Sequence, residues 1–214
     1  MLRSRKKEYT IIEDELFRIR LTALMDIFCH MLRFNKKDAP PNENECVYGF
    51  LKGKIEGTTR IVTEVETILH HPTPDFEFNE QFLQDMADFN ARYIEEQSLD
   101  RIIGWYKSTN ATIEFKAMDV KNHLKFQNLN PQYVGMIIDP QEFLHDNGYG
   151  FSVFTLLPDS GGEINIMSGA AKIPWEIMSI EEYKDSVVSY LKDLVFKTME
   201  RKKFVTELSE AFED

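Results

Sequence analysis

Histidine is the side chain that most often serves as a general base or metal ligand near neutral pH, and this chain has five of them. They are His30, His70, His71, His123 and His145. His70 and His71 are adjacent, so on a strand they would point to opposite faces and would not share one ion. The sequence has no His-x-His, His-x-x-x-His or Cys-x-x-Cys pair to begin a zinc site. The histidine spacing therefore predicts no metal centre, and we expect His30, inside a helical segment, to be structural.

The usual nucleophile and phosphate-binding motifs are missing as well. Neither GxxxxGK nor GxGxxG occurs, and Gly148-Tyr-Gly150 predicts only a loop. Ser160-Gly-Gly162 has the flanks of a turn and not of a nucleophile elbow. Cys46 opens a predicted strand, where a small buried hydrophobic side chain is the simpler interpretation. Residue by residue, the sequence contains no catalytic constellation.

The composition is that of a folded, acidic protein. The 214 residues include 25 Lys and Arg against 36 Asp and Glu, which gives a formal net charge of −11. An apolar content of 43% is enough for a sizeable hydrophobic core. Binding to nucleic acid needs clustered cations, so we do not expect this chain to bind DNA independently.

The lack of targeting signals and the small number of cysteines predict a cytoplasmic protein. No apolar run approaches the ~18 residues of a membrane span, and the basic start lacks the apolar stretch of a secretory signal. Cys29 and Cys46 are too few for a disulfide framework, so a reducing compartment is expected.

The apolar periodicity predicts an α/β domain followed by helices. It indicates a strand over 17–21, a helix over 21–32 and a β-hairpin over 46–69. A helix over 79–97 with Asn79 as its N-cap, a strand over 101–107, a helix over about 115–128 and strands over 133–138 and 151–157 follow. Ser179-Ile-Glu-Glu182 has the spacing of a capping box, and the pattern beyond it is helical. We therefore predict an α/β domain over 10–175 and a C-terminal helical segment over 176–214.

Three stretches together resemble a known family. They are Cys46-Val-Tyr-Gly-Phe-Leu-Lys-Gly53, Ile102-Ile-Gly-Trp-Tyr-Lys-Ser-Thr109 and Tyr133-Val-Gly-Met-Ile-Ile-Asp-Pro140. In this order, separated by a long helix and then a shorter one, they are similar to the JAB/MPN domain. The likeness covers about residues 15–175 and implies an MPN-like mixed β-sheet flanked by helices.

Active members of this family are zinc hydrolases that cleave isopeptide bonds to ubiquitin. Two histidines and an aspartate hold the zinc, and a glutamate before the hairpin glycine acts as the base. Here the glutamate position holds Cys46, the histidine positions hold Lys107 and Thr109, and Asp119 lies one residue short of the aspartate position. A protonated lysine repels a metal ion, so the resemblance implies a degenerate site with no zinc cofactor and no hydrolase activity. An enzyme with a rebuilt site that uses Cys46 or Lys107 is the alternative.

Non-catalytic members of the family pair with a second MPN subunit inside large assemblies. Gly104-Trp-Tyr-Lys-Ser-Thr109 and Pro74-Asp-Phe-Glu-Phe78 are most similar to the h subunit of eukaryotic translation initiation factor 3. This implies a scaffold for translation initiation, bound to MPN and helical-bundle subunits and, through the complex, to the small ribosomal subunit. The proteasome lid and the signalosome are alternative assemblies. A free-standing ubiquitin- or RNA-binding module is a further alternative, based on the basic start and Arg201-Lys-Lys203.

Two apolar stripes are the candidate partner surfaces. One lies on the predicted helix 79–97 and the other on the C-terminal segment. Packing on the chain's own core is the alternative for both, because most apolar stripes are core. The candidate interface residues are Phe82, Met86, Phe89, Tyr93, Val187, Leu191, Leu194 and Val195.

Overall fold

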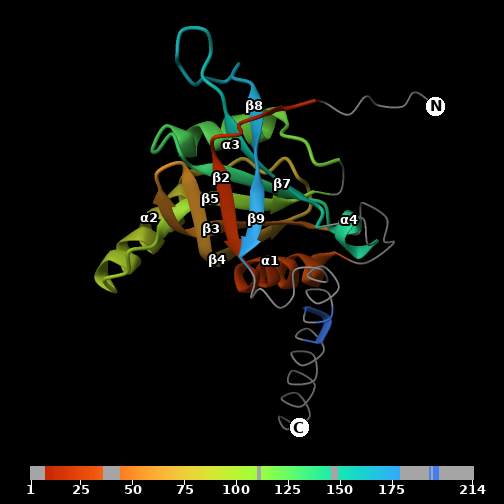
Figure 1. Cartoon of the computed structure of the whole chain (residues 1–214). Coiled ribbons are helices and arrows are strands. Elements are labelled where there is room, and N and C mark those ends of the chain that lie inside the picture. Colours follow the sequence, from red (N-terminus) through yellow and green to blue (C-terminus); the bar gives the residue numbers. More distant parts are fainter. Residues whose placement is uncertain are drawn as a thin grey trace, which may run out of the picture.

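The computed structural model describes residues 8–35, 44–109, 112–145, 149–178, 193 and 195–197. Within these ranges one mixed sheet of nine strands carries helices on both faces (Figure 1). The strands are β1 (Thr10–Ile11), β2 (Leu16–Arg20), β3 (Cys46–Glu56), β4 (Thr59–His71), β5 (Arg101–Ser108), β6 (Val134–Ile138), β7 (Phe151–Leu156), β8 (Ala170–Ile173) and β9 (Trp175–Met178). The helices are α1 (Leu21–Phe34), α2 (Glu80–Glu95), α3 (Ala117–Gln127) and α4 (Pro140–Leu144).

The sheet curls until its two edges meet. Its strand order is β1-β8-β7-β6-β5-β3-β4-β2-β9, so β8 lies near one end and β9 at the other. Only Pro174 separates β8 from β9 in the chain, and one residue spans no more than about 3.6 Å. Backbone hydrogen bonds from Ile12 N to Lys172 O (3.0 Å) and from Phe17 N to Pro174 O (2.9 Å) continue the β1–β8 and β2–β9 pairings up to this junction. We call this junction, residues 12–17 with 172–175, the seam.

Each face of the sheet is covered by its own hydrophobic cluster. The first cluster holds α1 and α4, whose Phe28 and Phe143 rings stack with centroids 3.9 Å apart. The second cluster holds α2 and α3, packed on strand residues that include Trp105. Along β5, Trp105 belongs to the second cluster and Tyr106 to the first, as the two-residue period of a strand requires. Residues of β5 that share the face of Trp105 therefore lie under α2 and α3.

The predicted mixed sheet flanked by helices is confirmed, and the helices and strands predicted within residues 17–157 are all present. Their ends differ by a few residues, and the β-hairpin continues to His71. The sequence analysis missed β1, β8 and β9, because strands of two to four residues contain too few positions to show a period. It also missed α4, which starts where Asp139 accepts a hydrogen bond from Gln141 N (2.9 Å) and Pro140 occupies the first turn.

The predicted boundary between residues 175 and 176 falls inside β9. This strand pairs in parallel with β2, with Trp175 opposite Phe17, so the sheet extends to Met178. Most of the predicted helical segment lies outside the described residues. Asp193, Val195, Phe196 and Lys197 are helical, and Val195 is completely buried in the first cluster.

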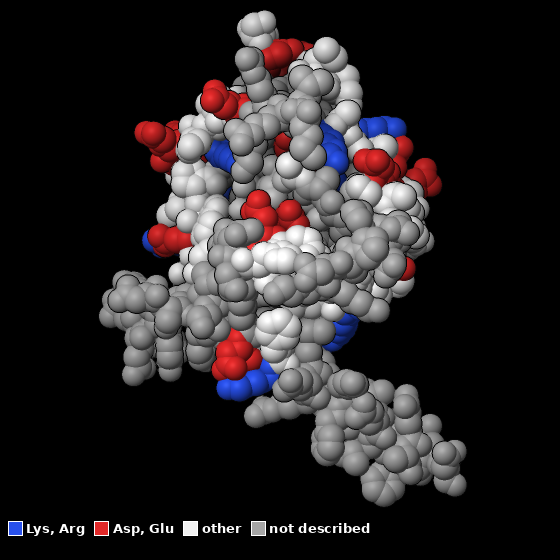
Figure 2. Space-filling view, turned by 90° about the vertical axis from the view of Figure 1, so that its right-hand side faces the viewer, with Lys and Arg blue, Asp and Glu red and all other residues white. Residues whose placement is uncertain are grey.

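Charged side chains form small separate groups on the surface. On the face drawn in Figure 2, acidic groups alternate with isolated basic ones among the coloured residues. None of the described helices is long and apolar enough to cross a membrane.

Candidate functional site

A buried ion pair lies between the end of β5 and the first turn of α3. The Lys107 ammonium contacts Asp119 Oδ1, and the two side chains are 2% and 1% exposed. Lys107 Nζ also donates a hydrogen bond to Pro74 O (3.0 Å), while Asp119 Oδ2 accepts one from Lys116 N (2.9 Å). Burial raises the pKa of the Asp119 carboxyl, and the Lys107 ammonium opposes that rise. Each charged group is therefore buried from solvent and has two partners within the chain.

Cys46 and Thr109 lie close to this pair in the sheet. In the antiparallel pairing of β3 with β5, Tyr48 is opposite Lys107, and Val47 N donates to Ser108 Oγ (2.9 Å). Cys46 is two residues from Tyr48 and so shares its face, and both belong to the second cluster. Thr109 is buried at the end of β5, where its N–H donates to Ile138 O (2.7 Å). The fold therefore brings Cys46, Lys107, Thr109 and Asp119 to one region, although only Lys107 and Asp119 form an ion pair with each other.

The segment before α2 covers this region. Tyr48 Oη donates to Thr73 O (3.3 Å), and the Asn122 side chain bonds Phe78 N (2.9 Å) and Phe76 O (2.8 Å). Burial, with smaller effects from Cys46 and Asp119, raises the pKa of the Tyr48 hydroxyl. Phe78 is completely buried and stacks on Phe82 with ring centroids 4.0 Å apart. Lys107 thus lies beneath a hydrogen-bonded aromatic cover.

The sequence analysis did not predict that segment 73–78 and Asn122 contribute to the site. A signal for Asn122 was present, because it follows Asp119 by three residues and therefore shares a helix face with it. No comparable pattern identifies Pro74, since its contribution is a backbone carbonyl.

Comparison with known proteins identifies the family of the chain. The profile of the family described as JAB1/Mov34/MPN/PAD-1 ubiquitin protease matches residues 15–132, which include all four of these positions. The chain belongs to this family. It is also similar to COP9 signalosome complex subunit 5 of Neurospora crassa, with 25% identity over 118 residues. That match covers 53% of this chain and 34% of the relative, so the chain spans about a third of the relative's length.

The zinc of JAB/MPN hydrolases does not fit the residues at this site. Structural and catalytic zinc sites take nitrogen, sulfur or carboxylate oxygen ligands in a tetrahedral arrangement. Here no imidazole is present at the four positions, Asp119 Oδ1 faces the Lys107 ammonium, and Oδ2 accepts the Lys116 N–H. Across the described ranges, no group of three His, Cys, Asp or Glu side chains is placed to hold a metal ion. No reaction step through a metal follows from this arrangement.

The apolar stripe of α2 packs on the chain's own core. Asn79 caps the helix by accepting a hydrogen bond from Phe82 N (2.9 Å), as expected. Phe82, Met86 and Tyr93 are buried in the second cluster, which supports the alternative of core packing over the partner surface for these three residues. Phe89 packs against the edge of the cluster and is partly exposed. Val187, Leu191 and Leu194 lie outside the described residues, whereas Val195 is buried in the first cluster.

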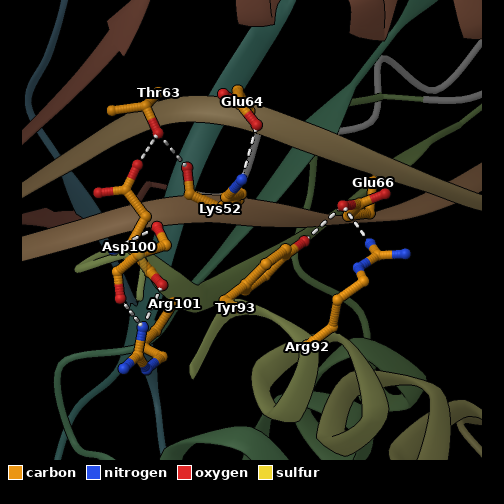
Figure 3. A network of polar contacts seen from close by, with 9 residues as sticks. Lys52, Thr63, Glu64, Glu66, Arg92, Tyr93, Asp100 and Arg101 are labelled. Atoms are coloured by element: carbon orange, nitrogen blue, oxygen red, sulfur yellow. Dashed lines mark hydrogen bonds and ion pairs between the residues drawn. The ribbon is translucent and has the colours of Figure 1, made fainter. Parts of the chain in front are cut away.

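A polar network fixes the C-terminal end of α2 to the β-hairpin (Figure 3). Tyr93 Oη donates to Glu66, which also pairs with Arg92 at 3.0 Å. Thr63 Oγ1 donates to Asp100 Oδ2 at 2.5 Å. The ammonium of Lys52 lies 4.3 Å from the centre of the Tyr93 ring. The contacts of Glu66 and Lys52 connect β4 and β3 with α2, and the Thr63–Asp100 bond connects β4 with the segment between α2 and β5.

Proposed function

We propose that this chain is a non-catalytic JAB/MPN scaffold subunit of a multi-subunit complex and acts by binding other proteins. The observation that carries the proposal is the buried Lys107–Asp119 ion pair, whose residues fall at or next to zinc-ligand positions in the resemblance to the family. A lysine ammonium next to the carboxylate supplies the positive charge that the metal would supply, but it provides neither a bound water nor a Lewis acid. The fold is thereby retained while the chemistry is lost.

The ubiquitin-pathway assemblies are our first choice for the complex. The similarity to a COP9 signalosome subunit extends over 118 residues. The resemblance to the h subunit of initiation factor 3 rests on two short stretches, 74–78 and 104–109. We therefore propose a subunit of the signalosome or proteasome-lid class, with a second MPN subunit as the direct partner, and keep initiation factor 3 as the second candidate.

Metal content tests the non-catalytic part of the proposal. We expect elemental mass spectrometry to find only trace zinc in the purified full chain. We also expect the chain to leave ubiquitin dimers uncleaved. A matched variant, Cys46→Glu with Lys107→His and Thr109→His, restores the family's ligand types and is expected to gain zinc. Stoichiometric zinc or isopeptide cleavage in the natural chain would contradict the proposal.

Affinity purification of the tagged full chain from its own cells tests the scaffold part. Recovery of signalosome or lid subunits supports the first choice, and recovery of initiation-factor subunits moves the assignment to the second candidate. Leu191→Asp with Leu194→Asp is expected to prevent incorporation. Lys197→Asp is the control, because the Lys197 side chain is 62% exposed. Recovery of the natural chain without partners would contradict a scaffold role.

A further inference from the structure

A pocket of about 300 Å³ lies beside the seam and includes none of the four family-site residues. Its walls come from distant parts of the chain, among them Tyr9 before β1, Glu114 before α3, Glu142 of α4, Phe151 of β7 and Trp175 of β9. This volume is at the lower end of the range for small-ligand sites and suits one side chain or a small molecule. We call it the seam pocket.

One wall of the seam pocket is aromatic. The rings of Tyr149 and Trp175 meet edge to face at 88°, with centroids 5.4 Å apart, and the ring of Phe151 lies 4.3 Å from that of Trp175. Tyr149 and Trp175 are only half-buried, so these rings are accessible from the pocket. The π face of an aromatic ring attracts cations, and a group of rings is the usual way in which proteins bind organic ones.

The seam pocket also contains two unpaired carboxylates. Glu114 and Glu142 are both half-buried, and in the part of the chain that the structure describes neither carboxylate has a hydrogen bond or ion pair. Lys172 is the single cationic residue in the lining, and its ammonium lies 5.5 Å from the centre of the Tyr9 ring and 5.6 Å from that of Phe154. Two carboxylates against one ammonium leave the pocket with net negative charge.

We infer that the seam pocket binds the guanidinium group of an arginine side chain that a partner protein presents. A guanidinium is planar, stacks on aromatic rings and donates in a fork to carboxylates, whereas an ammonium is compact and more strongly hydrated. The half-buried walls leave the pocket open to solvent, which suits a side chain that projects from another surface. This inference rests on the proposed function, because it names the chemistry by which the scaffold holds a partner.

The test uses the full chain and the capped peptide Gly-Gly-Arg-Gly-Gly, followed by tryptophan fluorescence. The chain has two tryptophans, and Trp105 is completely buried, so a change reports on Trp175. We expect a saturable change with the arginine peptide and at least fivefold weaker binding of the peptide with neutral citrulline in its place. Equal binding of the two peptides would overturn the inference. Tighter binding of free arginine amide than of the peptide would also overturn it, in favour of a small-molecule site.

Charge-neutral variants locate the binding. Glu114→Gln and Glu142→Gln should each weaken arginine-peptide binding by about fivefold, the order of one exposed cation–π or ion-pair contact. Glu163→Gln removes the same charge from an exposed position outside the pocket and should leave binding unchanged. Equal affinities of all three variants would overturn the inference. If the natural chain does not bind the arginine peptide but still recovers its partners in the affinity purification, the inference is overturned. The scaffold proposal then remains in place.

Discussion

Between the end of β5 and the start of α3, the Lys107 ammonium and the Asp119 carboxylate are almost completely buried and contact each other. In the seam pocket, two carboxylates are half-buried and have no ion-pair partner in the described ranges. A charge removed from water needs a partner in the protein, whereas a half-exposed carboxylate stays hydrated. The same side-chain types therefore have a structural role under α2 and α3 and remain available to a ligand beside the seam. Burial, and not residue type, separates the two regions.

The largest effect expected from this difference is on stability. Lys107→Met leaves the Asp119 carboxylate buried without its cation, and loss of one partner of a buried pair costs about 3–5 kcal/mol. Urea unfolding of the full chain measures this loss. The matched change in the seam pocket, Glu142→Gln, is expected to alter the unfolding free energy by less than about 0.5 kcal/mol.

A second variant separates loss of the ion pair from loss of packing. Adding Asp119→Asn to Lys107→Met removes the unpaired charge, so part of the lost stability should return. A cost below about 1 kcal/mol for Lys107→Met alone would show that the two regions do not differ as argued.

Acidification probes the buried groups of both clusters. Burial lowers the pKa of His30, whose Nδ1 lies 2.8 Å from the Tyr106 hydroxyl, to about 4, and that of His123, which accepts a hydrogen bond from Trp105 Nε1 (3.1 Å), to about 3. The unfolded chain binds these protons first, near pH 6.5, so each histidine contributes stability that is present above that pH and lost below it. The expected loss is about 1.4 kcal/mol per pH unit per histidine as the pH falls from 6.5 towards 4.

Unfolding free energies measured between pH 7 and pH 4.5 test this prediction. Replacing one histidine by glutamine should reduce the slope of the unfolding free energy against pH by the contribution of one proton. An unchanged slope in both His30→Gln and His123→Gln would contradict the assignment to these groups.

A smaller effect is expected in the polar network of Figure 3, whose members range from the buried Thr63 and Tyr93 to the exposed Glu64. Thr63→Val keeps the shape of the side chain and removes the hydrogen bond to Asp100, which costs about 1 kcal/mol. Thr67→Val, at an exposed position of the same strand, is the control and should be nearly neutral. Equal unfolding free energies for the two variants would show that the Thr63–Asp100 hydrogen bond does not stabilise the segment that follows α2.

The sequence by itself determined the longer elements and the family. The helices and hairpin follow from apolar periods, which are local, and the family from three stretches whose residues adjoin in the chain. The sequence also predicted Asn79 as the cap of α2, because capping depends on residues three positions apart.

Only the tertiary structure decided which of these residues meet. Lys107 and Asp119 are twelve positions apart, and their contact under the carbonyl of Pro74 depends on how β5, α3 and segment 73–78 pack. The stripe of α2 has the same period whether it covers its own core or a partner, and the sheet beneath it settled the choice for Phe82, Met86 and Tyr93. The seam pocket has no pattern in the sequence, because its walls come from five separate segments that meet only when the sheet closes. Periodicity specifies the face that a residue lies on, but long-range packing specifies what that face touches.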